Sequence, residues 1–247
     1  MLGRVLTFVY GAVSYAAFLA TILYAVGFVG NFAVPKSMDS VLYGSMQRSL
    51  LIDLGLLALF ALQHSVMARP AFKRAFTRIV PATIERSTYV FASSAALLFL
   101  FWRWRPLGGR VWEIQSEWGK VILYGGFALG WMLVLLATFV INHFDLFGLR
   151  QVWRHLLGKS QTKLRFSTPF LYQMVRHPLY LGFLLAFWST PTMTLTHAFF
   201  ALVTTAYILT AIQLEERDLM REHPEYAEYR KQVPMLLPGL PRQMTSD

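Results

Sequence analysis

The sequence predicts an all-α integral membrane protein with about five hydrophobic segments, the last a helical hairpin, and a cytoplasmic C-terminal helix. Of its 247 residues, 55% are hydrophobic and only 15% are charged, and the mean hydropathy is +0.45. The charges are spaced so that long stretches carry none. The formal net charge is nevertheless +10. A chain of this kind is typical of a membrane protein with basic loops, whereas a nucleic-acid-binding protein has more charged residues.

Five uncharged stretches define the expected membrane segments. They are residues 5–35, 54–68, 87–102, 121–144 and 177–214. Since a crossing needs about 20 apolar residues, the first and fourth are long enough, and the second and third need polar flanks such as Asp53 and Ser87. The last would form a helix of about 57 Å. Pro191 interrupts it, which predicts a hairpin with a short first arm. One long tilted helix is the alternative.

The distribution of basic residues predicts the topology. If the N-terminus is cytoplasmic, 17 of the 23 Lys and Arg residues lie in cytoplasmic segments and six lie on the opposite side. This positive-inside bias requires 177–214 to return to the cytoplasm. We therefore expect one multi-pass domain over 1–247, with both termini cytoplasmic. Gly126 and Gly130 place two small residues four apart on the fourth segment, which predicts helix packing.

Several kinds of site are not supported by the sequence. There is no cysteine, so disulfides and thiolate metal sites are excluded. We find no Rossmann glycine motif, no Walker A sequence and no His-Glu-x-x-His. The six histidines are dispersed without ligand spacing. The basic residues follow the membrane topology and form no stripe interleaved with aromatic residues. We therefore expect neither a bound metal nor a nucleic-acid partner.

An acidic cluster follows the predicted hairpin. Six of the 13 acidic residues lie within positions 215–228. Such a run is usually a solvated helix of mixed charge. Glu215 and Glu216, however, end a membrane helix, where a carboxylate is costly unless it faces something polar. A cationic or hydroxyl-rich ligand would satisfy them.

A second polar cluster opens the hairpin, over residues 172–182. Pro178 suits the first turn of a helix. Arg176 and His177 then stand at a helix N-terminus, where free backbone N–H groups favour an anion. Gly182 permits a close approach by a backbone or a ligand. The alternative is an interfacial anchor of Arg and Tyr. If both hairpin arms cross the membrane, the two clusters meet on one side, where a zwitterionic ligand with an aromatic part would fit.

At these positions the chain resembles the membrane-embedded methyltransferases related to isoprenylcysteine carboxyl methyltransferase. The family pattern is Tyr-x-x-x-Arg-His-Pro-x-Tyr-x-Gly, then Glu-Glu, Tyr-x-x-Tyr and Val-Pro after an apolar hairpin. Here it is carried by Tyr172, Arg176, His177, Pro178, Tyr180, Gly182, Glu215, Glu216, Tyr226, Tyr229, Val233 and Pro234. One departure is His223-Pro224, where the family has Phe-Gly.

Three further segments resemble a smaller branch of that family. They are residues 63–69, 85–90 and 142–150. This branch contains bacterial methanethiol S-methyltransferases and NnrU-like proteins. The resemblance implies S-adenosylmethionine as methyl donor, methanethiol as the small thiol substrate, dimethyl sulfide as product, and a bacterial inner membrane as location, with membrane lipid as a further partner. It also implies that 142–240 binds the donor through the motif residues from Tyr172 to Tyr229, and that His64, Tyr89 and Arg150 face the substrate.

Methylation of a thiol requires loss of its proton, so a base within reach is expected. His143 is the first candidate, because it lies beside Asn142 and Asp145 at the cytoplasmic end of the fourth segment. Asp145 could orient its imidazole or raise its pKa. Alternatively, these three residues cap a helix. His64 is the second candidate, although a histidine in an apolar helix is more often a packing residue.

Other functions fit parts of the same pattern. A methyltransferase of this fold could act on an isoprenylcysteine carboxylate or on a phospholipid amine, which would need a lateral opening. Sterol reductases that use NADPH share an Arg/His-Pro-x-Tyr-x-Gly element. An NnrU-like accessory protein without enzymatic activity is a further alternative. A binding assay with both cofactors would separate the reductase from the methyltransferases, and absence of donor binding would favour the accessory protein.

Overall fold

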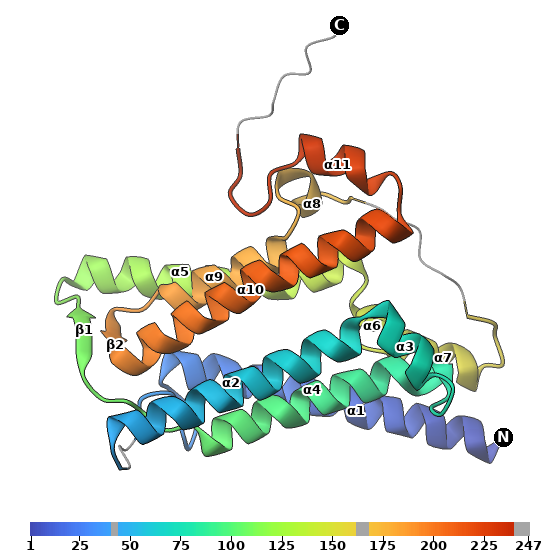
Figure 1. Cartoon of the computed structure of the whole chain (residues 1–247), viewed down its shortest axis with the longest axis horizontal. Coiled ribbons are helices and arrows are strands. Elements are labelled where there is room, and N and C mark those ends of the chain that lie inside the picture. Colours follow the sequence, from blue (N-terminus) through green and yellow to red (C-terminus); the bar gives the residue numbers. More distant parts are fainter. Residues whose placement is uncertain (41–43, 162–167, 240–247) are drawn as a thin grey trace, which may run out of the picture.

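The computed structural model describes residues 1–40, 44–161 and 168–239 as a bundle of long helices (Figure 1). The bundle helices are α1 (Leu2–Gly30), α2 (Met46–Ala68), α4 (Ala82–Arg103), α5 (Glu117–Ile141), α9 (Pro178–Trp188) and α10 (Leu195–Glu222). The shorter elements are α3 (Pro70–Phe76), β1 (Arg110–Glu113), α6 (His143–Leu146), α7 (Leu149–Leu156), α8 (Leu171–Met174), β2 (Thr192–Thr194) and α11 (Tyr226–Gln232).

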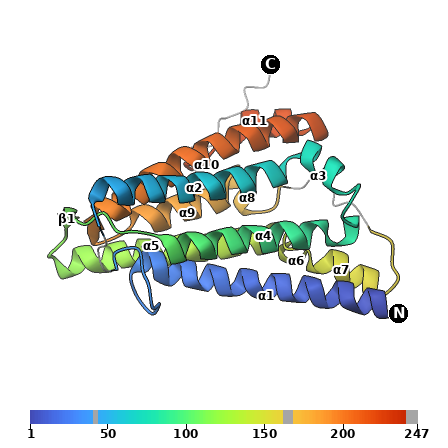
Figure 2. The ribbon, with the colours of Figure 1, turned by 60° about the horizontal axis from the view of Figure 1, so that its bottom comes forward.

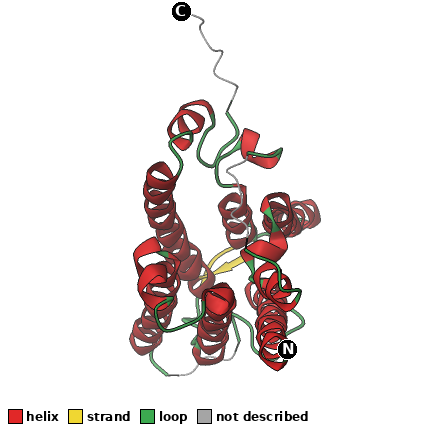
Figure 3. Cartoon of the chain, turned by 90° about the vertical axis from the view of Figure 1, so that its right-hand side faces the viewer, coloured by secondary structure: helices red, strands yellow, loops and turns green. Residues whose placement is uncertain are grey.

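The two ends of the bundle differ in structure. Helices α3, α6, α7, α8 and α11 and the N-terminus lie toward one end, which we call the site end (Figures 1 and 2). The opposite end, the strand end, carries β1 and β2, which pair antiparallel with Glu113 opposite Thr192. In the end-on view the yellow strands lie far behind the red helices (Figure 3). The N-terminus and α11 therefore lie at the same end of the bundle, as the predicted topology requires. That this end faces the cytoplasm stays a prediction.

Four helices of the described chain are long and apolar enough to cross a membrane, namely α1, α2, α5 and α10. Helix α4 has 22 residues, but its first turns include Glu85 and Arg86. The predicted count of about five segments thus stays a prediction.

The hairpin over 177–214 is confirmed. Helix α9 has 11 residues, or about 16 Å, which is too short to cross a membrane alone. The chain turns around Pro191 and β2. Helix α10 then begins where the Thr194 side chain accepts a hydrogen bond from the His197 N–H. The alternative of one long tilted helix is therefore wrong.

Helices α5 and α9 pack with their backbones in close approach. A Cβ atom on Gly182 would lie 2.7 Å from the Gly130 carbonyl oxygen, and one on Gly130 would lie 2.5 Å from the Ala186 nitrogen. A Cβ on Gly126 would lie 2.7 Å from Ser189 Oγ. The prediction that Gly126 and Gly130 serve helix packing is confirmed. The missing side chain of Gly182 is likewise explained by α5, without a ligand.

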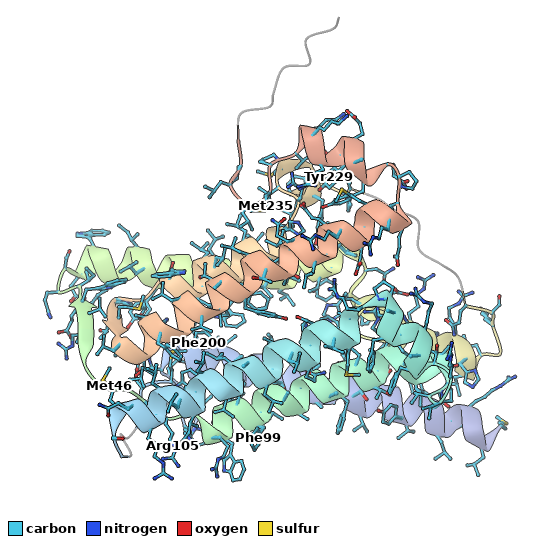
Figure 4. All side chains as sticks on the ribbon, viewed as in Figure 1. Met46, Phe99, Arg105, Phe200, Tyr229 and Met235 are labelled. Atoms are coloured by element: carbon cyan, nitrogen blue, oxygen red, sulfur yellow. The ribbon has the colours of Figure 1, made fainter. Side chains whose placement is uncertain are left out.

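The apolar core lies nearer the strand end. Phe28, Phe101, Trp104 and Phe200 are buried there together, and Phe200 is labelled between α10 and α2 in Figure 4. Trp104 packs edge-on against both Phe28 and Phe200, with ring centroids 5.9 and 5.8 Å apart. Each such aromatic contact stabilises the core by about 0.5–1.5 kcal/mol beyond area burial. The buried core of this half of the bundle is therefore apolar.

Candidate active site

Glu216 is the centre of a buried ionic cluster near the end of α10. Its side chain is 2% exposed. Its Oε1 accepts hydrogen bonds from Arg176 Nε (2.8 Å), from the Tyr226 hydroxyl (3.2 Å) and, at 3.0 Å, from His177 Nε2. Arg230 Nε lies 3.1 Å from Oε2. We call these five residues the Glu216 cluster. A buried carboxylate is tolerated only with such partners, so the cluster ties α9, α10 and α11 together.

The C-terminal segment covers the start of α9. Arg176 Nη1 donates to the Arg230 carbonyl at 2.9 Å. The backbone N–H groups of Arg176 and His177 donate to the carbonyls of Pro234 and Met235, at 2.9 and 3.2 Å (Met235 is labelled in Figure 4). The expectation that these donors are free to bind an anion is therefore wrong, because the chain itself occupies them.

The two tyrosines of α11 are also occupied within the protein. Tyr226 bonds to Glu216, and the Tyr229 hydroxyl donates to the Tyr172 carbonyl at 2.5 Å. Burial raises the pKa of Tyr229 to about 12. Burial, and then the nearby charge of Glu215, raises the pKa of Tyr172. Pro178 occupies the first turn of α9 as predicted. Tyr226 and Tyr229 thus hold α11 against α8 and α10.

Glu215 stands in different surroundings from Glu216. It is half-buried, and its Oε2 accepts a hydrogen bond from the Tyr180 hydroxyl at 2.9 Å. Tyr172 and Tyr89 lie close enough to interact with its charge, and Tyr207 lies close to both Tyr89 and Tyr180. We call these residues the Glu215 cluster. A carboxylate among four phenol rings offers both hydrogen-bond acceptance and aromatic faces to a ligand.

His64 joins this cluster through Tyr89. The Tyr89 hydroxyl lies 2.9 Å from His64 Nε2 and 3.1 Å from Nδ1, and Ser93 Oγ lies 3.2 Å from Nδ1. The next residue, Ser65, links α2 to the cluster a second time, because its Oγ lies 3.1 Å from the Tyr207 hydroxyl. The structure therefore brings His64 and Tyr89 together with Tyr180 and Glu215, although they come from four different helices.

His143 lies in a separate aromatic pocket. It is 3% exposed, and its ring stacks on Phe139 with centroids 4.1 Å apart. Thr138 Oγ1 donates to the Leu135 carbonyl, so it accepts from His143 Nδ1–H at 2.8 Å. Nε2 is then the acceptor for the Tyr15 hydroxyl at 2.7 Å. Burial lowers the pKa of His143, and both of its ring nitrogens have hydrogen-bond partners within the protein.

The expected partnership between His143 and Asp145 is wrong. Asp145 pairs instead with Arg150, whose Nη1 lies 3.1 Å from its Oδ1. The pKa of His143 is lowered by burial, not raised by a carboxylate. Asn142 Oδ1 accepts from the Asp145 N–H at 3.2 Å and so caps α6, as the alternative proposed. Arg150 pairs with Asp145, and its expected contact with the substrate stays a prediction.

Some residues of these clusters were not singled out in the sequence. Tyr207 could have been, because it precedes Glu215 by about two helical turns and therefore shares its face. Arg230 and Ser93 carry no local signal, since only the folding of α11 and α4 brings them into place. In the part of the chain that the structure describes, no group of three His, Asp or Glu side chains could hold a metal ion.

A membrane bundle whose hairpin opens with Arg-His-Pro-x-Tyr-x-Gly and closes with Glu-Glu has the pattern of the membrane-embedded methyltransferases. Its relatives agree. The chain is 56% identical over 238 residues to methanethiol S-methyltransferase from Crocosphaera subtropica, covering 96% of this chain and 93% of that protein. It is 50% identical over 236 residues to the enzyme of that name from Mycobacterium tuberculosis, covering 95% and 97%. The chain belongs to the methanethiol S-methyltransferase family.

A more distant similarity extends beyond these bacterial enzymes. Nurim from Sus scrofa is 31% identical over 202 residues, which is 75% of each chain. No protein-family model and no solved structure matches the chain. The relatives favour a thiol methyltransferase over the reductase and accessory-protein alternatives.

Proposed function

We propose that this protein methylates methanethiol to dimethyl sulfide with S-adenosylmethionine as the donor. The family membership supports the thiol substrate, and methyl transfer requires a donor. The observation that carries the donor site is the Glu215 cluster. Within the described chain, the one hydrogen bond to the Glu215 carboxylate is that from Tyr180 to Oε2. Oε1 is therefore available for a ligand, in contrast to Glu216, whose Oε1 accepts three hydrogen bonds and whose Oε2 forms an ion pair with Arg230.

The chemistry of the Glu215 cluster fits this donor. A sulfonium is a cation and a ribose presents hydroxyl groups, and a carboxylate serves either. The rings of Tyr172 and Tyr180 can stack on adenine or hold a cation by cation–π contact, worth about 0.5–2 kcal/mol. The donor's own carboxylate needs a cation, and Arg176 is engaged elsewhere. Arg86 lies near Tyr89, and we assign that role to it.

The substrate base in this proposal is His64 rather than His143. When bound, S-adenosylmethionine supplies an electrophilic methyl group. An alkyl thiol is mostly protonated at neutral pH, whereas the thiolate is the nucleophile. His64 accepts the thiol proton, and Tyr89 fixes the imidazole by its hydroxyl contact. The surrounding apolar helices would exclude water from the thiolate and the methyl donor.

The decisive experiment measures product directly. Purified protein in detergent is given methanethiol and S-adenosylmethionine, and dimethyl sulfide is quantified in the headspace. We expect turnover in the wild type and in Glu222→Gln, an exposed control near the end of the same helix. Strongly reduced turnover is expected in Glu215→Gln. Donor binding without dimethyl sulfide would contradict the substrate assignment, and absence of donor binding would contradict the donor assignment.

A further inference from the structure

A cationic cavity lies at the strand end, remote from both glutamate clusters. It has a volume of about 390 Å³ and is lined by Lys36, Trp102, Arg103, Trp104 and Arg105. Lys36 follows α1, and the other four residues form the end of α4 and the chain after it. We call it the outer cavity. Its three cations are half of the six basic residues that the predicted topology assigns to the side opposite the N-terminus.

These cations are held in place without a carboxylate partner in the cavity. Lys36 Nζ donates to the Trp102 carbonyl at 2.6 Å. The Arg103 guanidinium lies over the Trp102 ring, 5.3 Å from its centroid. The Arg105 backbone N–H donates to Asp53 Oδ1 at 2.9 Å. Among the described residues, no salt bridge involves Lys36, Arg103 or Arg105.

The charge balance of the outer cavity favours an anion. The buried carboxyl group of Asp53 accepts the Arg105 backbone N–H and lies close enough to Lys36 to act on its charge, so it offsets at most one of the three positive charges. Partial burial, and the neighbouring charges of Arg105 and Arg103, lower the pKa of Lys36, whereas Asp53 acts in the opposite direction. Like-charge repulsion of this kind is relieved when an anion binds. A guanidinium group can donate two parallel hydrogen bonds to two oxygens of one phosphate.

The rim of the outer cavity points to a lipid as the source of that phosphate. Trp102 is 65% exposed and Phe99, one helix turn earlier, is 43% exposed. Figure 4 places Phe99 and Arg105 along the same edge of the bundle, where α4 ends. Exposed tryptophan beside a transmembrane-type helix is typical of the interface between head groups and acyl chains. The apolar face of α4 below it offers a path for acyl chains.

We propose that the outer cavity binds the phosphate of an anionic phospholipid, with Lys36, Arg103 and Arg105 contacting the head group and Trp102 packing beside it. The site is independent of methyl transfer. It anchors the loop after α1 to the loop after α4 through a shared ligand.

The test is lipid binding by native mass spectrometry on the delipidated full-length protein. Phosphatidylglycerol, phosphatidylcholine of the same acyl chains and inorganic phosphate are titrated separately. The site variant is Lys36→Gln/Arg103→Gln/Arg105→Gln. The matched control, Arg48→Gln/Arg110→Gln/Lys120→Gln, removes the same charge from the same end. If the site variant does not fold, Arg103→Gln/Arg105→Gln leaves the bond of Lys36 to Trp102 intact.

Wild type and control are expected to bind phosphatidylglycerol about tenfold or more tightly than the site variant, in line with the worth of basic residues at anionic membranes. Phosphatidylcholine is expected to bind weakly to all three. Equal affinity of wild type and site variant for phosphatidylglycerol would overturn the proposal. Equal binding of the two lipids would do the same. Binding of inorganic phosphate as tight as that of phosphatidylglycerol would overturn the lipid as ligand.

Discussion

Two adjacent glutamates near the end of α10 stand in opposite environments. Glu216 is buried, and its carboxylate is engaged by four side chains: those of Arg176, His177, Tyr226 and Arg230. Glu215 is half-buried and holds one hydrogen bond, from Tyr180. Successive residues of an α-helix point about 100° apart, so the pair must face different neighbours. The difference separates a carboxylate that stabilises the fold from one that is available to a ligand.

The largest effect is expected at the structural glutamate. Glu216→Gln keeps the shape but leaves the buried Arg176 without a countercharge, which typically costs about 3–5 kcal/mol. We expect a large fall in thermal unfolding temperature in detergent and loosening of α11. Glu222→Gln serves as the control and should unfold like the wild type. An unchanged unfolding temperature in Glu216→Gln would show that the ionic cluster is not structural.

Replacing the proposed base should affect turnover rather than folding. His64→Gln is expected to lower kcat about 100-fold, as loss of a general base commonly does. Turnover of the variant should rise steeply with pH, because only thiolate formed in solution can then react. His143→Gln, the comparison variant, should keep the pH profile of the wild type. If His143→Gln changes the profile and His64→Gln does not, the two roles are reversed.

The ligand-facing glutamate should affect donor affinity. Glu215→Gln is expected to weaken S-adenosylmethionine binding about tenfold, which corresponds to about 1.4 kcal/mol. The unfolding temperature should change much less than in Glu216→Gln. Tyr180→Phe removes the hydroxyl that bonds to Glu215 but keeps the ring, so a smaller loss of affinity is expected. Calorimetric titration measures the affinity of both variants for S-adenosylmethionine. Full affinity in Glu215→Gln would place the donor elsewhere.

The smallest effect concerns acid stability. Burial lowers the pKa of His143 in the folded protein, so protonation favours the unfolded chain. Its contribution to stability is therefore complete above the unfolded pKa of about 6.5 and declines as the pH falls below it. The unfolding temperature of the wild type should drop between pH 7 and 5. The unfolding temperature of His143→Gln should fall less over that range. An equally steep fall would show that other groups cause the loss of stability in acid.

Much of the fold could be predicted from the sequence because hydropathy and length constrain membrane helices strongly. The 38 uncharged residues over 177–214 are too many for one crossing, and Pro191 marks the turn. The spacing of Gly126 and Gly130 predicted their packing. The pairing of β1 with β2 could not be predicted, since four- and three-residue strands carry no periodic signal.

The site was harder to predict because adjacent residues in a motif do not share surroundings. The motif contains both Arg176 and Glu215, but only the fold shows that the C-terminal segment occupies Arg176 while Glu215 faces tyrosines. Asp145 lies two positions from His143 in sequence, yet it pairs with Arg150. Tyr207 and Tyr89 meet only through the packing of α10 near α2 and α4. Tertiary contacts decided each of these cases.

The central claim is that the methyl donor binds beside Glu215 and not in the pocket of His143. Photolabelling with a radiolabelled S-adenosylmethionine, followed by peptide mapping, tests it most directly. We expect label on peptides that contain Tyr172, Tyr180 or the segment 207–215, and loss of that label in Glu215→Gln. Label confined to peptides around His143, unaffected by Glu215→Gln, would contradict it.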